Sequence, residues 1–282
     1  MSKTFVIGDI HGAHKALEQC LERCGFDFEN DTLITLGDIC DGWPYVYECV
    51  ELLLKCKHRI DIIGNHCDWF RRWLITGSHP DGWGQGGKGT ASSYLRMLGK
   101  DVNAFTTEKH HYPGYGYFRT YRFDLAPDEI PDTHKAFFEN QKLYYKDELN
   151  RVFTHAGFNP DISLKENQRI KPDIFYWDRG FWNRALYALE DDFNIEYKEE
   201  IKEVFIGHTE TTSYTQFNTK PGSFVLIPGN LDNCPPVHAD IIWNIDTGAG
   251  STGKLTIMDV DTHEYWQSDL VSTFYGEYKP RG

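Results

Sequence analysis

The stretch TFVIGDIHG, residues 4–12, decides the fold. Its first four residues are β-branched or aromatic and predict a strand that stops at Gly8. Asp9 and His11 alternate just past this strand, so the two-residue period of an extended chain points both side chains the same way. A carboxylate and an imidazole on one rigid strand end make half of a metal site.

The same unit of strand, loop and helix recurs along the first part of the chain. Apolar periodicity predicts helices over residues 13–23 and 45–55, and short apolar runs predict strands over 32–36 and 59–63. Strands that alternate with helices form βαβ units and a parallel sheet, in which ligands bind at the carboxyl ends of the strands. We therefore expect the polar residues after each strand to share one site.

The second half of the chain is rich in predicted strands. They are expected over residues 152–154, 203–206, 223–227, 241–245 and 255–260. Residues 69–150 are richer in Gly, Trp and Tyr and less regular, so we interpret them as a helical and looped insertion over the sheet that shapes substrate specificity. Because there is no internal repeat, low-complexity tract or Pro/Ser-rich linker, residues 1–282 are predicted to form a single domain.

Composition disfavours several classes of protein. The chain carries 42 acidic and 29 basic residues, and its net charge of −13 repels nucleic acid, so no nonspecific nucleic-acid binding is expected. Two bound divalent cations would reverse the potential at a pocket and admit a phosphorylated substrate. The sequence has no signal-peptide core or membrane-length apolar run, and its seven cysteines include no Cys-x-x-Cys pair. We therefore expect a cytoplasmic protein with reduced thiols and no membrane contact.

Ligand-type residues follow four more predicted strands. They are Asp38, Asn65 with His66, His155 and His208. Each is weak evidence alone, because an Asp after a strand often caps a helix and a lone His is usually structural. Together, however, they all follow apolar runs, and most adjoin a Gly that lets the backbone turn sharply. Carboxylates, imidazoles and one amide oxygen are suitable ligands for manganese, iron or zinc in a two-metal site.

Five motifs give the chain a resemblance to a known family. They are Gly8-Asp9-Ile10-His11-Gly12, Gly37-Asp38-Ile39-Cys40-Asp41-Gly42, Gly64-Asn65-His66, His155-Ala156-Gly157 and Gly207-His208-Thr209. They resemble the calcineurin-like metallophosphoesterases, and within them the phosphoprotein phosphatase branch, which includes bacterial serine/threonine phosphatases and symmetrical dinucleoside tetraphosphatases. The resemblance extends from Gly8 to Gly248. It implies a four-layer α/β/β/α sandwich in which two mixed β-sheets are flanked by helices.

The resemblance also implies a role for each residue. The ligands of one metal would be Asp9, His11 and Asp38. Those of the other would be Asp38, Asn65, His155 and His208, with Asp38 as the bridge. His66 would be the general acid, oriented by Asp41, and a hydroxide between the metals would be the nucleophile. Two cations roughly 3.5–4 Å apart can lower the pKa of a shared water and clamp both the attacking and the leaving oxygen. Manganese is the expected ion, with iron, zinc, nickel and cobalt as alternatives.

The chain departs from the family pattern at Gly42, where the family commonly has an arginine that grips the phosphate. The loss of such a bidentate contact should weaken substrate binding or pass the task to another residue. Residues 176–180, Tyr-Trp-Asp-Arg-Gly, look like the family's second arginine segment, so Arg179 is the first candidate, together with Asn65. A surface salt bridge from Arg179 to Asp178 or to a neighbouring residue is the alternative. Weaker candidates are Arg184, Arg71, Arg72 and Lys88.

Three further features leave alternatives open. Gly86-Gly87 before Thr90 is similar to a segment that shapes the pocket wall in bacterial members of the family, or else it is a flexible turn. The aromatic run over residues 110–121 could stack a nucleobase, but a hairpin packed on the core is the favoured interpretation. Cys40 and Cys67 adjoin site residues, so either could be sensitive to oxidation, but buried thiols beside strands are usually inert.

The leading hypothesis for function is metal-dependent hydrolysis of phosphomonoesters, of the serine/threonine phosphatase type. The substrate would be a phosphopeptide, a nucleotide or a small phosphoester. Hydrolysis of symmetrical dinucleoside polyphosphates, such as diadenosine tetraphosphate, is the first alternative. A catalytically inactive binding protein on the same fold is the second, and it is disfavoured because every metal and acid residue is present. The sequence leaves the oligomeric state open.

Overall fold

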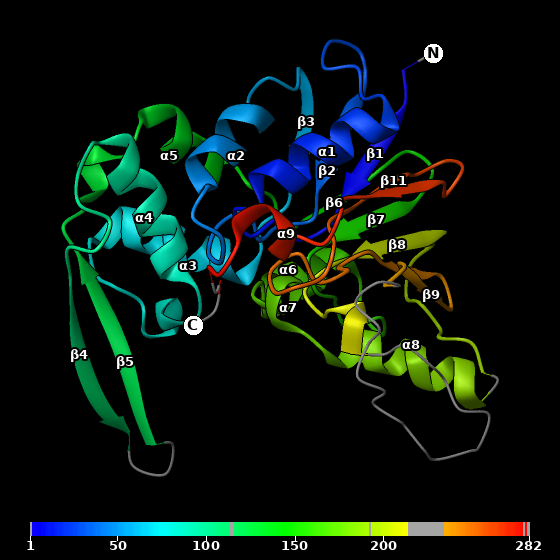
Figure 1. Ribbon diagram of the computed structural model, residues 1–282. Coiled ribbons are helices and arrows are strands. Elements are labelled where there is room, and N and C mark those ends of the chain that lie inside the picture. The colour runs from blue at the N-terminus through cyan, green and yellow to red at the C-terminus, as the bar shows by residue number, and fades with distance from the viewer. Residues whose placement is uncertain (1, 113–115, 192, 214–233, 279, 281–282) are drawn as a thin grey trace.

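The computed structural model describes residues 2–112, 116–191, 193–213, 234–278 and 280 (Figure 1). The elements up to residue 139 are β1 (Thr4–Ile7), α1 (His14–Cys24), β2 (Thr32–Thr35), α2 (Val46–Leu53), β3 (His58–Asp61), α3 (Asn65–Thr76), α4 (Gly87–Met97), β4 (Phe105–Tyr112), β5 (Gly116–Phe123) and α5 (Asp132–Glu139). The later elements are β6 (Tyr144–Lys146), β7 (Arg151–Thr154), α6 (Leu164–Ile170), α7 (Ile174–Trp177), α8 (Gly180–Asp191), β8 (Glu203–Ile206), β9 (Val237–Ala239), β10 (Ile242–Asn244), β11 (Thr256–Asp259), β12 (Tyr265–Gln267) and α9 (Ser272–Tyr275). Short 3₁₀ turns lie at Asp81–Gly84, Pro127–Glu129 and Thr211–Ser213. Within the described ranges, the helices are too short or too polar to cross a membrane.

Two five-stranded sheets form the centre of the described chain. Their strand orders are β12-β11-β1-β2-β3 and β6-β7-β8-β10-β9. In the first sheet β1, β2 and β3 are parallel, whereas β11 runs antiparallel to β1 and β12. In the second, β7, β8 and β10 are parallel, and β6 and β9 are antiparallel edge strands. Both sheets are therefore mixed, as the resemblance implies.

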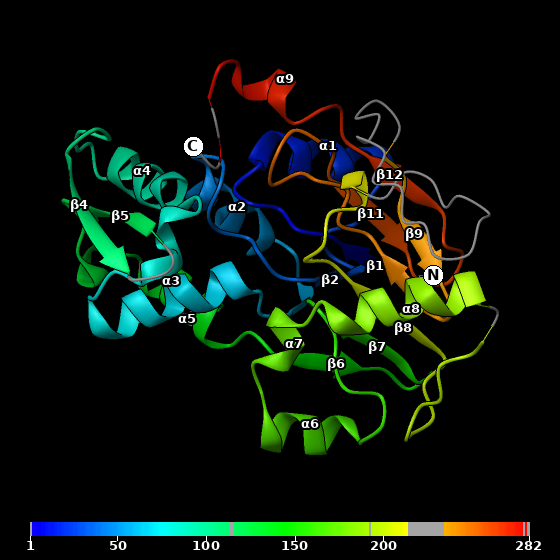
Figure 2. The ribbon, with the colours of Figure 1, turned by 90° about the horizontal axis from the view of Figure 1, so that it is seen from below.

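The two sheets pack face to face because alternate residues of each strand point to opposite sides. In β1, Phe5 and Ile7 belong to the apolar cluster that includes α1 and α2, whereas Val6 faces the other sheet. Phe153 of β7 and Phe205 of β8 meet Val6 there, with their own ring centroids 5.0 Å apart. Helices α1 and α2 cover the outer face of the first sheet, and α6, α7 and α8 cover that of the second (Figures 1 and 2). The predicted four-layer α/β/β/α sandwich is confirmed.

Most of the predicted helices and strands are observed, with ends that differ by at most two residues. The strand predicted over residues 223–227 lies outside the described residues. The sequence does not predict β6, β9 and β12. Each of these has three residues and lies at the edge of a sheet, so it is too short to produce a clear alternation of apolar and polar side chains.

The insertion predicted over residues 69–150 begins inside α3 and contains α4, the hairpin of β4 and β5, and α5. Its last part is not an insertion over the sheet, because β6 is a strand of the second sheet. The hairpin is confirmed, although the side chains of residues 107–121 lie outside the described residues. Phe105 and Phe123 pack on the core at its base, and the strands project from the body of the molecule (Figure 1).

Candidate metal centre

The carboxyl ends of five strands meet where the two sheets adjoin. Strand β1 leads to Asp9 and His11, β2 to Asp38, β3 to Asn65, β7 to His155 and β8 to His208. All six side chains are buried, with at most 8% of any residue exposed. The structure thus brings together every metal ligand predicted from the sequence.

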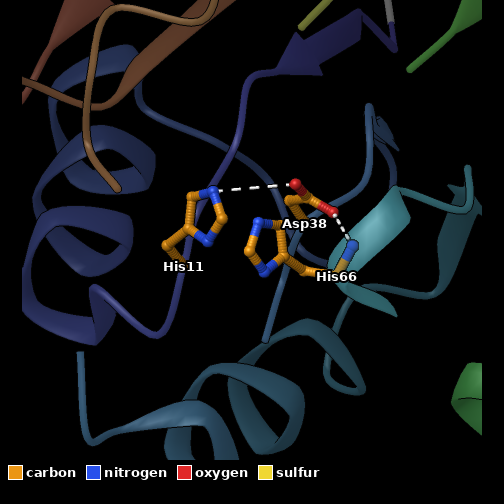
Figure 3. A group of neighbouring side chains, drawn as sticks. All are labelled: His11, Asp38 and His66. Carbon is orange, nitrogen blue, oxygen red and sulfur yellow. Dashed lines mark hydrogen bonds and ion pairs between the residues drawn. The ribbon is translucent and has the colours of Figure 1, made fainter. Parts of the chain in front are cut away.

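Asp38 lies at the centre of this cluster. Its Oδ2 is 3.7 Å from His11 Nε2 and 3.4 Å from His155 Nε2. Its Oδ1 accepts a hydrogen bond of 3.0 Å from the backbone N–H of His66, and Figure 3 shows the rings of His11 and His66 side by side next to the carboxylate. Ligand atoms of His11, Asp38 and His66 lie within 4.8 Å of one another, as do those of Asp9, Asp38 and His155. Asp38 belongs to both groups, as a bridging carboxylate would.

The remaining contacts join the other predicted ligands to this centre. His155 Nε2 lies 3.1 Å from Asn65 Oδ1 and 3.2 Å from His208 Nδ1. The backbone N–H of His208 donates to the carboxylate of Asp9 at 3.2 Å. Residues separated by up to 199 positions in the chain therefore direct their polar atoms at one another.

The hydrogen bonds of the histidines fit bound cations. His155 Nδ1 lies 2.8 Å from the carbonyl oxygen of Leu36, and His11 Nδ1 lies 3.1 Å from that of Asp41. Because a carbonyl only accepts, Nδ1 carries the proton, and in a neutral imidazole Nε2 then presents a lone pair to the cluster. Both Nε2 atoms lie near the central carboxylate, at 3.7 and 3.4 Å from Asp38 Oδ2, where a shared cation would contact all three groups. The Nε2 atom of His208 is buried and has no hydrogen-bond partner among the described residues.

Burial and neighbouring groups set the charges of the cluster. Burial is the main cause that lowers the pKa of His208 to about 2, and the nearby His155 is the second. The His208 ring is therefore neutral, which is the form that binds a metal. Burial by itself raises the pKa of Asp38, but the attraction of His155 and His66 outweighs it and holds this pKa well below its usual value. The site therefore offers an ionised carboxylate and a neutral imidazole.

The backbone approaches the carboxylates closely. A Cβ atom on Gly64 would lie 2.0 Å from Asp38 Oδ1, and one on Gly207 would lie 2.1 Å from Asp9 Oδ1, so only glycine fits at either position. Asp38 and His208 have φ angles of 43° and 66°. Such left-handed conformations cost about 1–3 kcal/mol per residue and often mark functional sites.

His66 and Asp41 form a hydrogen-bonded pair beside the cluster, with 2.9 Å between Nδ1 and Oδ2. The second carboxylate oxygen of Asp41, Oδ1, accepts from Trp83 Nε1 at 2.8 Å and from Thr90 Oγ1 at 2.6 Å. Thr90 Oγ1 in turn accepts from the backbone N–H of Asp41 at 2.8 Å. The segment around Gly86-Gly87 is therefore part of the wall of the site and leads into α4. The contacts of Trp83 and Thr90 with Asp41 depend on tertiary packing, so the sequence alone does not predict them.

The family model of the calcineurin-like phosphoesterases matches residues 2–210. The chain belongs to this family. Among its relatives, the asymmetrical bis(5'-nucleosyl)-tetraphosphatase PrpE of Oceanobacillus iheyensis is 24% identical over 188 residues, which cover 62% of the chain and 64% of that protein. PrpE of Bacillus mycoides is 23% identical over 265 residues, or 89% of the chain and 87% of that protein. The symmetrical bis(5'-nucleosyl)-tetraphosphatase of Coxiella burnetii is 24% identical over 165 residues, or 58% of the chain and 45% of that protein. The chain therefore spans less than two thirds of the first and third of these relatives.

Solved structures have the same fold. A crystal structure described as a candidate diadenosine tetraphosphatase has a TM-score of 0.56 and 14% identity, and the match covers 94% of this chain and 92% of that one. A protein serine/threonine phosphatase from Saccharomyces cerevisiae has a TM-score of 0.50 and 12% identity, with 99% and 83% of the two chains covered. At these identities the likeness supports the sandwich fold of this calcineurin-like phosphoesterase and nothing finer.

The structure explains why this calcineurin-like phosphoesterase has a glycine, Gly42, where other members of the family commonly have an arginine. Gly42 has a φ angle of +99°, and its N–H donates to the carbonyl oxygen of Gly86 at 2.9 Å. A Cβ atom on Gly89 would lie 2.1 Å from the carbonyl oxygen of Gly42, and one on Gly42 would lie 3.0 Å from the Cβ of His11. The first turn of α4 thus packs directly on the backbone at Gly42, where a side chain would be both strained and crowded.

Arg179 is brought next to the cluster of this calcineurin-like phosphoesterase. Its Nη1 donates to Thr209 Oγ1 at 2.9 Å and to the backbone carbonyl of His208 at 3.4 Å. The alternative partner, Asp178, accepts a hydrogen bond of 2.6 Å from the backbone N–H of Phe181. The guanidinium of Arg179 is therefore held beside a predicted metal ligand.

The weaker arginine and lysine candidates make other contacts. Arg184 pairs with Asp161 at 3.4 Å, and Lys88 lies over the ring of Phe105 at 4.9 Å. Arg71 and Arg72 pair with Asp68 of α3, at 3.3 and 2.7 Å. The structure does not bring Arg184 or Lys88 to the cluster of this calcineurin-like phosphoesterase.

Proposed function

We propose that this phosphoesterase hydrolyses phosphomonoesters in the manner of a serine/threonine phosphatase, with two divalent cations, most simply manganese. The observation that carries the proposal is the position of Asp38 in two groups of buried side chains that could each hold a metal ion. These groups are His11 with Asp38 and His66, and Asp9 with Asp38 and His155, and His66 is also paired with Asp41. One cation would take Asp9, His11 and Asp38, and the other Asp38, Asn65, His155 and His208. When bound, the cations would supply Lewis-acid polarisation of the phosphoryl group and a water of lowered pKa.

His66 would act as the general acid. Its Nδ1 is engaged by Asp41 Oδ2 at 2.9 Å, so the other ring nitrogen, Nε2, would carry the proton that the leaving oxygen receives. The buried carboxylate of Asp41 would fix the ring orientation and stabilise the imidazolium. The position of His66 in one of the two ligand groups also places it close to where the phosphoryl group would lie.

Arg179 and Asn65 would bind the phosphate. The guanidinium of Arg179 is steadied by Thr209 Oγ1 at 2.9 Å and lies beside His208, so little side-chain freedom is lost when it contacts an oxyanion. Arg179 would thereby bind the phosphate in place of the arginine that other members of the family commonly have at the position of Gly42.

Hydrolysis of dinucleoside polyphosphates is the second candidate function, and the tetraphosphatases among the relatives favour it. A catalytically inactive binding protein is the least favoured, because no predicted ligand or acid residue has been replaced. We also retain three sequence predictions. A single domain is supported by the core shared between the two sheets, and a cytoplasmic location by seven free, buried cysteines. A phosphopeptide, nucleotide or small phosphoester is the expected substrate.

A direct test is a screen of the manganese-loaded chain against an aryl phosphate, a phosphoserine peptide and diadenosine tetraphosphate. Release of inorganic phosphate from the first two is the expected result. Faster cleavage of diadenosine tetraphosphate than of either monoester would instead establish the second candidate function, with the nucleotide products showing whether cleavage is symmetrical. A chain that binds the metal but hydrolyses none of these compounds would leave only the binding protein.

A further inference from the structure

Two tryptophans lie against the histidines of the candidate metal centre. Trp69 of α3 makes an edge contact with His66, with ring centroids 4.7 Å apart, and Trp177 at the end of α7 makes one with His208 at 6.3 Å. The two indole rings are 5.4 Å apart and inclined by 58°. The pair, which we call the aromatic wall, thus joins α3, whose buried residues belong to the apolar cluster of α1 and α2, to α7, which covers the second sheet.

One member of the aromatic wall, Trp177, is more exposed than the other described tryptophans. Trp43, Trp73 and Trp182 are each 1% exposed, whereas Trp177 is 40% exposed. Leaving so much of an indole in water forgoes hydrophobic stabilisation. Trp177 lies beside His208 and two residues before Arg179, so its exposed ring adjoins the proposed phosphate-binding side of the metal centre.

We propose that the aromatic wall binds a planar aromatic ring carried by the phosphoester, either the base of a nucleotide or the aryl ring of a phenolic ester. The inference rests on the proposed function and adds the class of substrate to it. An indole face stacks on any flat ring in an offset or edge-on arrangement, without sequence-specific hydrogen bonds. A group protonated by His66 would leave past Trp69, which contacts the His66 ring.

The position of the hairpin favours the aromatic wall over residues 110–121 as the place for a ring. In both views the β4–β5 hairpin lies beyond α4, away from α7 (Figures 1 and 2). Trp69, in contrast, lies next to Trp177, with 5.4 Å between the ring centroids.

The test compares matched ligands that the enzyme cannot hydrolyse, by calorimetry on the manganese-loaded full chain. One pair is adenosine 5'-(α,β-methylene)diphosphate and methylenediphosphonate, and the other is phenylphosphonate and methylphosphonate. Trp177→Ala should weaken binding of the aromatic member of at least one pair about tenfold, as expected for the loss of one stacking contact. Binding of its non-aromatic partner should stay within twofold. Trp177→Phe, which keeps a flat ring, should retain most of the affinity.

A loss confined to the adenosine compound identifies a nucleobase as the natural occupant, and a loss confined to phenylphosphonate identifies an aryl ester. Equal losses in both members of a pair, or no loss in any ligand, overturn the proposal. Tyr265→Ala is the matched control, since Tyr265 is 42% exposed on the edge strand β12 and should change neither pair. Hydrolysis of glycerol phosphate by wild type tests the proposed function separately, because that substrate has no ring.

Discussion

Replacing Thr90 by Val tests the acid pair without touching His66 or Asp41. The side chains have nearly the same shape, so no cavity forms, but the change removes the donor to Asp41 Oδ1 at 2.6 Å and the acceptor for the Asp41 N–H at 2.8 Å. A hydrogen bond to a charged group contributes about 1.5–3 kcal/mol, and a buried unsatisfied N–H costs about 1–3 kcal/mol. The two losses together lower the expected free energy of unfolding by about 2.5–6 kcal/mol.

The catalytic effect of Thr90→Val should depend on the leaving group. General acid catalysis contributes about 10²–10⁴-fold, so a loosened Asp41 should lower kcat about 10- to 100-fold on an alkyl phosphate. A 2,4-dinitrophenyl ester, whose leaving group needs no proton, should lose much less. The assay is steady-state hydrolysis of both esters by the manganese-loaded variant, below its melting temperature. Thr90→Ser, which keeps the hydroxyl, should restore most of the loss on the alkyl ester.

Ser93 on the same helix supplies the matched control. It is buried and accepts from the backbone N–H of Tyr47 at 2.9 Å, but it makes no contact with Asp41 in the described structure. Ser93→Ala should destabilise the chain while changing both esters equally. Equal losses on both esters in Thr90→Val, or no loss at all, would refute the assignment of Thr90 to the positioning of the acid pair.

Three other predictions follow from the geometry. Gly64→Ala should abolish tight metal binding, measured by dialysis, because the new Cβ would lie 2.0 Å from Asp38 Oδ1. If the variant binds metal with the affinity of the wild type, the close contact between Gly64 and Asp38 is refuted. Arg179→Ala should raise KM for all phosphoesters about tenfold, as expected when a hydrogen bond between charged groups is lost. Arg184→Ala is the control and should leave KM unchanged, because Arg184 pairs with Asp161. Equal effects of the two variants on KM would show that Arg179 does not bind the phosphate. Burial raises the pKa of the Cys40 thiol well above its usual value, so little thiolate forms at pH 8. Alkylation of Cys40 by iodoacetamide should therefore be slow in the native state, and rapid labelling of the native protein would contradict this.

The sequence predicts the ligands because each one follows a strand that its own residues encode. Residues 203–206, for example, form an apolar run that is observed as β8 with the same ends, and His208 follows directly. Trp83, Thr90, Trp69 and Trp177 could not be found in this way. Their roles depend on which helix packs beside which strand end, and local periodicity carries no information about that.

The edge strands and Gly42 show the same limit. Strands such as β9 form because a neighbouring strand offers unpaired backbone groups, so their own residues need little apolar patterning. The sequence shows that an arginine is missing at Gly42, but the reason, a direct backbone contact with Gly86, appears only once α4 is placed.

The central claim, a two-metal site bridged by Asp38, is tested most directly by counting bound Mn²⁺ in equilibrium dialysis. Two ions per chain are expected in wild type, with loss of at least one tight site in Asp38→Asn, since Asp38 belongs to both groups of side chains that could hold a metal ion. The variant should remain folded, as checked by circular dichroism. One ion per wild-type chain, or two ions held with unchanged affinity by Asp38→Asn, would contradict the central claim.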